Sequence, residues 1–389
     1  MLKSGKMRMI KLGLTTLLED KLELVEGRSV GLITNSTGVN ENLEDNISLF
    51  CKHPDVNLKA IFAPEHGLWA AVQDAVTVSS FEYGGVRIPV YSLYGETRKP
   101  TREMLEGIDV LIFDIQDVGA RFYTFISTMA MAMESCAEFG VDFVVLDRPN
   151  PIAGLTMEGN ILESAFRSFV GYLPVPVRHA MTAGELARFF NDHFQIGARL
   201  DVAEMTGWRR DMWFDDTGLQ WIMPSPNMPT LETATVYPGT CLFEGTNISE
   251  GRGTTRPFEI IGAPWIDASC LADKLNSLSL AGVKFRAAGF IPIFAKYKDR
   301  SCGGVQVHVL DRKKFAPVRT ALSMIDTIRR MYPDEFQWRG GDRKFFDVLM
   351  GTDSVRKRLS DGESVDSIIK SWESKLKAFS ESRSRYLIY

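Results

Sequence analysis

Apolar segments of strand length alternate with helix-like segments through the first half of this 389-residue chain, and this alternation limits the folds available to it. The strand-like segments are residues 29–34, 58–63, 109–115 and 141–146. Each is apolar almost throughout, as strands buried on both faces are. Strands that alternate with helices form parallel βαβ units. The sequence therefore predicts an α/β fold with a Rossmann-like parallel sheet and helices on both faces.

Chain length and a change in composition predict two domains. A chain of 389 residues is too long for one typical core. From Tyr237 onward, glycine and polar residues become frequent, and we place the boundary there. Residues 1–238 are predicted to form the Rossmann-like catalytic domain, and residues 239–389 a smaller C-terminal α/β domain that closes a cleft. The elements expected in the second domain are strands at 290–295 and 304–310 and helices at 317–331 and 365–379.

Charge and hydropathy argue against several kinds of partner. The formal net charge of −4 gives no reason to expect nucleic acid or an acidic membrane. No apolar run approaches the roughly 18 residues of a membrane helix. The first residues lack the apolar core of a secretory signal. We therefore expect a cytoplasmic protein as encoded, or a periplasmic or secreted one if an export leader has been removed.

The spacing of chemically active residues indicates neither a metal nor a cofactor. The five cysteines contain no CxxC pair, and the five histidines show no HExxH spacing. No GxGxxG follows the first predicted strand, which argues against a dinucleotide. A GxSxG serine motif is also absent. Hydrolysis by carboxylates is the chemistry best supported, and binding without chemistry stays open.

Polar residues follow three of the predicted strands at the point where each strand ends. Glu65 and His66 come between Pro64 and Gly67, directly after the second strand. The carboxyl ends of parallel strands meet at one edge of a sheet, and ligands bind beyond that edge. The sequence therefore predicts an active site there. The other polar residues expected at this edge are Gln116, Asp117 and Arg121 after the third strand, and Asp147, Arg148 and Asn150 after the fourth.

Glu65 is the first candidate for chemistry at this edge. Most glycosidases place two carboxyl groups on either side of the bond that they cleave. Glu65 could pair with Asp117 or with Glu250, and the sequence fixes neither distance. His66 could tune Glu65 or bind the substrate, although a histidine beside a turn often serves the fold alone.

A second group of polar residues lies in the glycine-rich segment 244–254. Glycine allows a backbone to approach a ligand closely. Glu244, Asn247, Glu250 and Arg252 supply the polar groups of this segment. The alternative reading is a solvated loop between the domains.

Six motifs together make the chain resemble the exo-β-N-acetylmuramidase family of bacterial cell-wall recycling. They span most of the chain in order, and two of them exceed ten residues. The motifs are GLITNSTG at 31–38, APEHG at 63–67, DIQDVGARFYTF at 114–125, LDRPNP at 146–151, LFEGTNISEGRGTTRPFE at 242–259 and GAPW at 262–265.

The resemblance implies an enzyme that releases N-acetylmuramic acid from the non-reducing ends of peptidoglycan fragments, in a cleft between two domains. It also implies that Glu65 is catalytic. The expected substrate is a muropeptide or a disaccharide fragment whose lactyl carboxylate is met by Arg121, Arg148 or Arg252. The expected catalytic residues are Glu65, His66, Asp117 and Glu250. The expected substrate-binding residues are Asn35, Arg121, Tyr123, Asp147, Arg148, Asn150, His179, Glu244, Asn247, Arg252 and Thr254.

Two other classes of function stay open at this point. One is a muropeptide-binding protein without catalysis. The other is a different amino-sugar hydrolase on the same fold, such as a deacetylase or an amidase. A deacetylase of the usual kind needs a metal, and the sequence shows no ligand cluster for one.

Overall fold

A computed structural model describes residues 10–70, 80–83, 86–95 and 97–389 of the chain. The first domain is built on a seven-stranded sheet, and six neighbouring strands of this sheet run parallel. At one edge β3 pairs with β4 in the antiparallel sense. The strands are, in spatial order, β3 (Ser80–Tyr83), β4 (Val86–Ser92), β2 (Asn57–Ala63), β1 (Ser29–Thr34), β5 (Val110–Asp114), β6 (Asp142–Leu146) and β9 (Leu200–Ala203).

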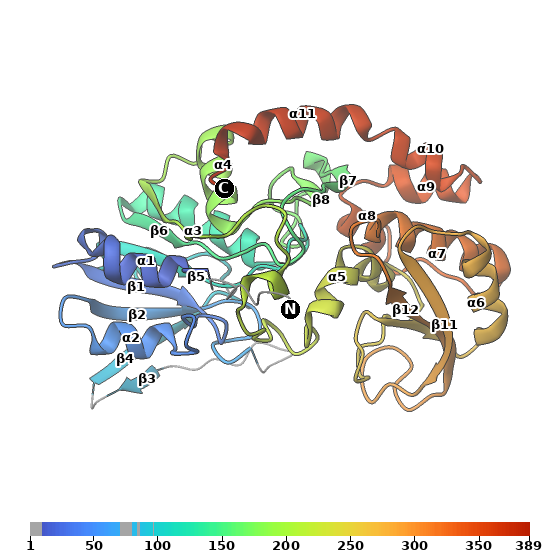
Figure 1. Cartoon of the computed structure of the whole chain (residues 1–389), viewed down its shortest axis with the longest axis horizontal. Coiled ribbons are helices and arrows are strands. Elements are labelled where there is room, and N and C mark those ends of the chain that lie inside the picture. The colour runs from blue at the N-terminus through green and yellow to red at the C-terminus, as the bar shows by residue number, and fades with distance from the viewer. Residues whose placement is uncertain (1–9, 71–79, 84–85, 96) are drawn as a thin grey trace, which may run out of the picture.

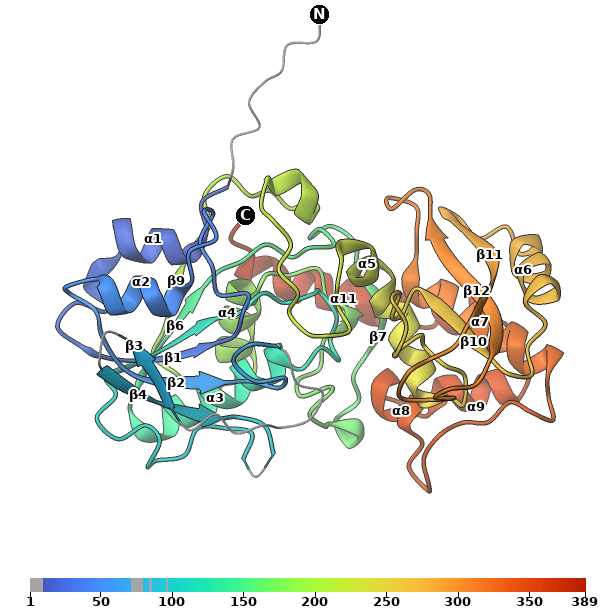
Figure 2. The same ribbon diagram turned by 90° about the horizontal axis from the view of Figure 1, so that it is seen from below.

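Helices cover both faces of this sheet, which confirms the predicted Rossmann-like α/β class (Figure 2). Leu111 and Phe113 of β5 belong to the core on one face, with α3 and α4. Val110 and Ile112 belong to the core on the other face, with α1 and α2. Burial on both faces is the reason why these strands are apolar without alternation. The four helices are α1 (Gly13–Asp20), α2 (Asn46–Lys52), α3 (Phe125–Phe139) and α4 (Ala183–His193).

The second domain is smaller and is built on an antiparallel three-stranded sheet. Its strands are, in spatial order, β10 (Ile260–Ala263), β12 (Cys302–Val309) and β11 (Val283–Phe290). The helices that pack with them are α5 (Leu231–Thr240), α6 (Ala268–Ser277) and α7 (Pro317–Met331). The predicted boundary at residue 238 falls inside α5, whose partner α7 lies in the second domain, and the boundary stays a prediction.

Shorter elements complete the chain. A two-stranded ribbon of β7 (Glu158–Ile161) and β8 (Pro176–Arg178) lies in the first domain. The chain ends with α8 (Phe345–Met350), α9 (Ser354–Ser360), α10 (Val365–Lys370) and α11 (Glu373–Arg383). Single 3₁₀ turns occur at Leu22–Leu24, Ser164–Phe166, Phe214–Thr217, Cys241–Gly245 and Ser384–Tyr386.

Three sequence-based assignments in the second half are wrong. The strand expected at 290–295 ends at its first residue, because the true strand is β11 and the next residues form a loop. The helix expected at 365–379 is two helices, α10 and α11, separated at Ser371 and Trp372. The loop expected from Tyr237 begins inside α5. There Gly239 permits contact with α7, since a Cβ atom would lie 2.0 Å from the carbonyl oxygen of Pro317.

Helix α11 leaves the second domain and crosses back over the first (Figure 1). Its Phe379 ring lies 5.4 Å from the ring of Phe189 on α4, in an edge-to-face contact. Tyr386, just beyond the helix, lies 5.3 Å from the same ring. The two domains are therefore joined by the C-terminal segment as well as by the chain around α5.

Arg121 forms the most heavily bonded polar contact between the domains. Its side chain is 1% exposed and donates four hydrogen bonds of 2.7–3.0 Å to backbone carbonyls. Two carbonyls belong to Asn160 and Val175 in the first domain, and two to Leu349 and Met350 at the end of α8. Burial lowers the pKa of this arginine to about 9. Arg121 therefore holds the domains together, and it does not line the cavity between them.

The first prediction concerns this contact. Arg121→Met should lower the free energy of unfolding by on the order of 3–5 kcal/mol, because four buried hydrogen bonds to a charged group are lost. Urea unfolding followed by circular dichroism measures the loss. The control is Arg343→Met, which removes an exposed arginine that bonds to the Ala165 carbonyl across the same contact. The control should change stability by roughly 0.5 kcal/mol or less. Similar losses in both variants would contradict the assignment.

Candidate active site

A cavity of about 430 Å³ lies between the domains, beyond the carboxyl ends of β2 and β4. Its volume is typical of a small-molecule site. The first domain contributes a lining that includes Glu65, His66, Tyr94, Arg98, Tyr123, Thr124, Phe169 and Ser225. The second domain contributes a lining that includes Tyr237, Glu244, Arg252, Phe258 and Phe345. Five of the predicted site residues thus share one cavity: Glu65, His66, Tyr123, Glu244 and Arg252.

A larger hollow of about 860 Å³ lies at the opposite end of the sheet. It is lined by residues at the amino ends of the strands, where open α/β folds do not bind ligands. Its arginines are occupied. Arg28 bonds to Asp142, and the guanidinium of Arg102 stacks 4.7 Å from the ring centre of Phe139. The cavity between the domains is therefore the better candidate for the active site.

Glu65 is held at the end of β2 by the turn that follows. Pro64 stops the strand, and its carbonyl accepts the N–H of Gly67 at 3.0 Å. His66 adopts a φ of +71°, a left-handed conformation that costs energy for a non-glycine residue. The hydroxyl of Thr124 donates to the Glu65 carboxylate at 2.5 Å. The strained turn and this bond fix the direction of the carboxyl group at the cavity.

Tyr123 carries a buried hydroxyl in the same cavity. Its ring packs edge-on against Tyr237 at 5.6 Å. Within the part of the chain that the structure describes, the hydroxyl makes no hydrogen bond of normal geometry, although Ser225 lies beside it. Burial raises the pKa of Tyr123, and the charges of Asp117 and Glu65 act in the same direction. The hydroxyl is therefore protonated and can donate to a bound ligand.

Arg252 and Glu244 form an ion pair in the lining. The Nη2 atom of Arg252 lies 2.7 Å from Glu244 Oε1, and its Nε atom lies 3.5 Å from Glu250 Oε1. Burial opposes the charge of Arg252, but the two carboxylates raise its pKa above the usual value. Glu250 also contacts Lys296 at 2.8 Å and is 3% exposed. Glu250 therefore lies behind the lining, and Glu244 is the carboxylate that the cavity shares with Glu65.

Asp117 and His179 form a buried pair outside the cavity lining. Their Oδ2 and Nε2 atoms lie 3.3 Å apart, and His179 is fully buried. The Nδ1 atom of His179 accepts the N–H of Met181, so the hydrogen-bond network places the ring proton on Nε2, toward Asp117. The charge of Asp117 acts on the Tyr123 hydroxyl. Neither residue lines the cavity, so the pair does not reach a ligand there directly.

Most polar residues expected at the edge of the sheet bond to neighbouring strands and loops of the protein. Arg148 contacts Asp114 at 2.6 Å and also donates to the carbonyl of Val39. Asn150 donates to the carbonyl of Met181, and Asn35 accepts from the backbone and hydroxyl of Thr37. These residues do not line the cavity. They brace the loops that follow β1, β5 and β6.

Asn247 and Thr254 are also used within the second domain. The side chain of Asn247 bonds to the backbone of Glu335 and Gln337. Thr254 donates to the carbonyl of Gly251 at 2.6 Å. Together with Arg121, they are predicted substrate-binding residues that the structure places outside the cavity.

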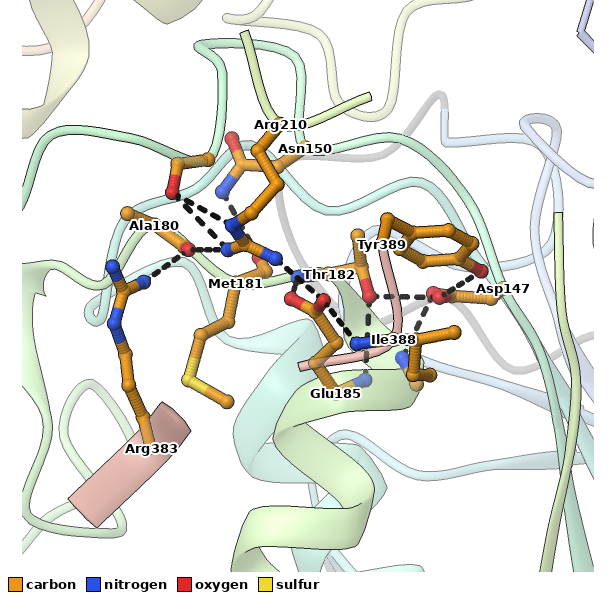
Figure 3. Close-up of polar contacts among 12 residues, drawn as sticks. Asp147, Asn150, Ala180, Met181, Thr182, Glu185, Arg210, Arg383, Ile388 and Tyr389 are labelled. Carbon is orange, nitrogen blue, oxygen red and sulfur yellow. Dashed lines mark hydrogen bonds and ion pairs between the residues drawn. The ribbon is translucent and has the colours of Figure 1, made fainter. Parts of the chain in front are cut away.

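Asp147 is bonded by the C-terminal segment (Figure 3). The hydroxyl of Tyr389 donates to its Oδ2 atom at 2.8 Å, and Thr182 donates to the same atom at 2.7 Å. Nearby, Ile388 donates its N–H to Glu185, and Arg383 donates to the carbonyl of Ala180 (Figure 3). The C-terminal segment therefore completes the loops on which Asp147 and His179 lie.

Several lining residues were not found by sequence reasoning. Thr124 lies inside the motif at 114–125, next to Tyr123, and its position at a helix start was a usable signal. Four other lining residues lie outside all six motifs, namely Tyr94, Arg98, Phe169 and Tyr237. Tyr237 lies on α5, and the loops after β4 and around residue 169 bring the other three residues to the same cavity.

The described ranges assemble no group of three or more His, Cys, Asp or Glu side chains that could hold a metal ion. Over the same residues, none of the helices combines the length and the apolar character needed to cross a membrane.

Comparison with known proteins identifies the class that this fold and cavity define, a two-domain α/β glycosidase. Residues 30–232 match the family model described as exo-β-N-acetylmuramidase NamZ, N-terminal, and residues 235–389 match its C-terminal counterpart. The chain belongs to this family. It is 50% identical over 386 residues to the peptidoglycan β-N-acetylmuramidase NamZ of Bacillus subtilis (strain 168), covering 99% of this chain and 93% of that protein.

Two crystal structures of DUF1343 family proteins from Bacteroides fragilis NCTC 9343 share the fold. One is 38% identical with a TM-score of 0.89, and the other is 29% identical with a TM-score of 0.75. Each match covers 98% of this chain and 99% of the other. The two-domain arrangement is therefore common to these proteins.

The second prediction tests the C-terminal contact. Tyr389→Phe should lower the free energy of unfolding by about 1.5–3 kcal/mol, because the buried Asp147 loses a hydrogen bond. Tyr386→Phe is the control, since its hydroxyl bonds to the exposed Asp192 and should contribute roughly 1 kcal/mol or less. Chemical unfolding of both variants provides the comparison. A smaller loss for Tyr389→Phe than for Tyr386→Phe would show that this contact is peripheral.

Proposed function

We propose that this protein is an exo-β-N-acetylmuramidase that releases N-acetylmuramic acid from the non-reducing ends of peptidoglycan fragments. Membership of the NamZ family supports this proposal. The observation that carries it is the position of Glu65, a carboxyl group held by Thr124 in a cavity between two domains. The substrate would be a muropeptide or a disaccharide of N-acetylmuramic acid and N-acetylglucosamine.

In the proposed mechanism, Glu65 protonates the oxygen of the glycosidic bond as it breaks. Thr124 orients the carboxyl group for this transfer. Glu244 is an ion-pair partner of Arg252 and is therefore a fixed negative charge in the same cavity. It can stabilise the positive charge that develops on the sugar ring or orient the attacking water. In this proposal Glu244 takes the place of Asp117 and Glu250 as the second carboxylate, because those two residues do not line the cavity.

Tyr123 adds a donor to this arrangement. Its buried hydroxyl has no partner of normal geometry among the described residues, so a substrate oxygen can satisfy it. Asp117, whose Oδ2 atom lies 3.3 Å from His179 Nε2, is one of the groups whose charge acts on this hydroxyl. We assign Asp117 and His179 as positioning residues that act through Tyr123.

The third prediction tests the role of Glu65. Glu65→Gln keeps an oxygen that can accept from Thr124 but cannot supply the proton. The rate on a chromogenic N-acetylmuramide should fall on the order of 100-fold or more. Thermal unfolding should stay as in the wild type. Glu103→Gln, which changes an exposed carboxylate in the opposite hollow, should keep the wild-type rate. Near-normal turnover by Glu65→Gln would sink the assignment.

The same assay separates the alternative functions. A sugar-binding protein without catalysis would release neither chromophore nor sugar. A deacetylase would release acetate, and addition of a chelator would inhibit it if it used a metal. Release of free N-acetylmuramic acid from a disaccharide, unchanged by chelator, supports the proposed function alone.

The fourth prediction separates activity from stability at Tyr123. Tyr123→Phe removes a buried hydroxyl without a well-formed hydrogen bond, so the fold should be unchanged or more stable by about 1 kcal/mol. The value of kcat/KM should nevertheless fall by roughly tenfold, because the substrate loses one donor. Unfolding curves and steady-state kinetics measure the two effects. A variant that is less stable yet fully active would reverse both expectations.

A further inference from the structure

The charged residues of the cavity leave one cation without a counter-charge among the described residues. Arg252 is matched by Glu244 and Glu250. Arg98, in the loop after β4, lines the same cavity and forms no ion pair in the part of the chain that the structure describes. The third acid, Glu65, is bonded to Thr124. Arg98 is therefore available to an anionic ligand.

Arg98 is also oriented by its neighbours. Its guanidinium lies over the ring of Phe169, 4.5 Å from the ring centre. Phe169 in turn packs against Tyr94, with ring centres 6.0 Å apart. A guanidinium that lies over an aromatic ring through its carbon atom keeps N–H donors available, and these donors match the two oxygens of a carboxylate. We call Tyr94, Arg98 and Phe169 the aromatic–arginine wall.

We propose that Arg98, held by Phe169, binds the lactyl carboxylate of N-acetylmuramic acid and so selects muramyl substrates. This inference rests on the proposed function and adds a specificity residue to it. The lactyl group is attached to C3, two ring positions from the anomeric carbon that Glu65 serves. Its binding partner must therefore share the cavity with Glu65 without contacting it. Arg98 and Glu65 meet this requirement, since both line the cavity and no bond between them is formed in the described structure.

The other arginines expected to meet this carboxylate are occupied. Arg121 spends four donors on backbone carbonyls, and Arg148 pairs with the buried Asp114. Arg252 already faces the carboxylates of Glu244 and Glu250, so a third carboxylate beside it would be repelled by their charge. A protein with a formal net charge of −4 attracts anions only through such local groups. Arg98 can supply this local charge without giving up an ion pair with another described residue.

The test compares three chromogenic muramides that differ only at the lactyl group. One carries the free carboxylate, one its neutral methylamide, and one an amide-linked L-alanine with its own carboxylate. Arg98→Met should lower kcat/KM on the free acid by about 10- to 100-fold, the range for a hydrogen bond to a charged group. The methylamide should change by less than about threefold. Arg98→Lys should restore part of the loss, because it keeps the charge but not the fork.

Arg102→Met is the matched control. Arg102 lies four residues further along and stacks on Phe139 at 4.7 Å, but it lines the hollow at the opposite end of the sheet. This variant should keep wild-type kinetics on all three muramides. Thermal unfolding of each variant confirms that the fold is intact. Inhibition constants of free N-acetylmuramic acid and its methylamide are measured in parallel, and only the first should weaken in Arg98→Met.

Each other outcome would overturn the proposal. Equal losses on the acid and the methylamide would show that Arg98 does not recognise the carboxylate. A loss confined to the L-alanine conjugate would assign Arg98 to a peptide carboxylate instead of the lactyl group. A wild-type protein that cleaves none of the muramides would refute the proposed function. Direct titration of the wild-type protein and Arg98→Met with the two sugars would then still decide whether Arg98 binds the carboxylate.

Discussion

The cavity depends on one buried guanidinium. Arg121 lies directly before the lining residues Phe122, Tyr123 and Thr124, and it bonds to carbonyls of both domains. The same short segment therefore connects the domains and presents the hydroxyls of the site. A shift of the second domain would move Glu244 and Arg252 relative to Glu65. Arg121 has no counter-ion among its bonded partners. Its four hydrogen bonds to carbonyls are therefore what stabilises its charge in the interior.

The polar residues at the edge of the sheet form two sets with different roles. One set, with Arg148, Asp147 and Asn150, bonds internally and gives the loops their shape. The other set, with Glu65 and Tyr123, lies at the cavity. The central crevice between β1 and β5, where ligands of open α/β sheets usually bind, contains the first set. The site is therefore displaced toward β2 and β4 and is completed by the second domain.

The parallel sheet and the position of Glu65 at the end of β2 could be predicted from the sequence, because apolar strands and the motif around Glu65 are local signals. The bounds of β1 and α7 were predicted to the residue. The predictions that failed concern residues and elements whose place is decided by tertiary contacts. Arg121 and Arg98 are both arginines near the site, and nothing in the chain tells which one meets backbone carbonyls and which one stacks on Phe169. The packing of α5 against α7 likewise overrides a composition typical of loops.

The bond between Tyr389 and Asp147 joins residues that are 242 positions apart in the chain. During synthesis, Asp147 and Glu185 belong to a domain that emerges from the ribosome early, whereas Tyr389 and Ile388, which donate one hydrogen bond to each of them, emerge last. The first domain can collapse early, but two of its carboxylates lack part of their solvation until the C-terminal segment docks. A contact of such sequence separation forms late and slowly. The two domains are therefore distinct in architecture but not independent in folding, and the first domain expressed alone would carry incompletely bonded acids in its core.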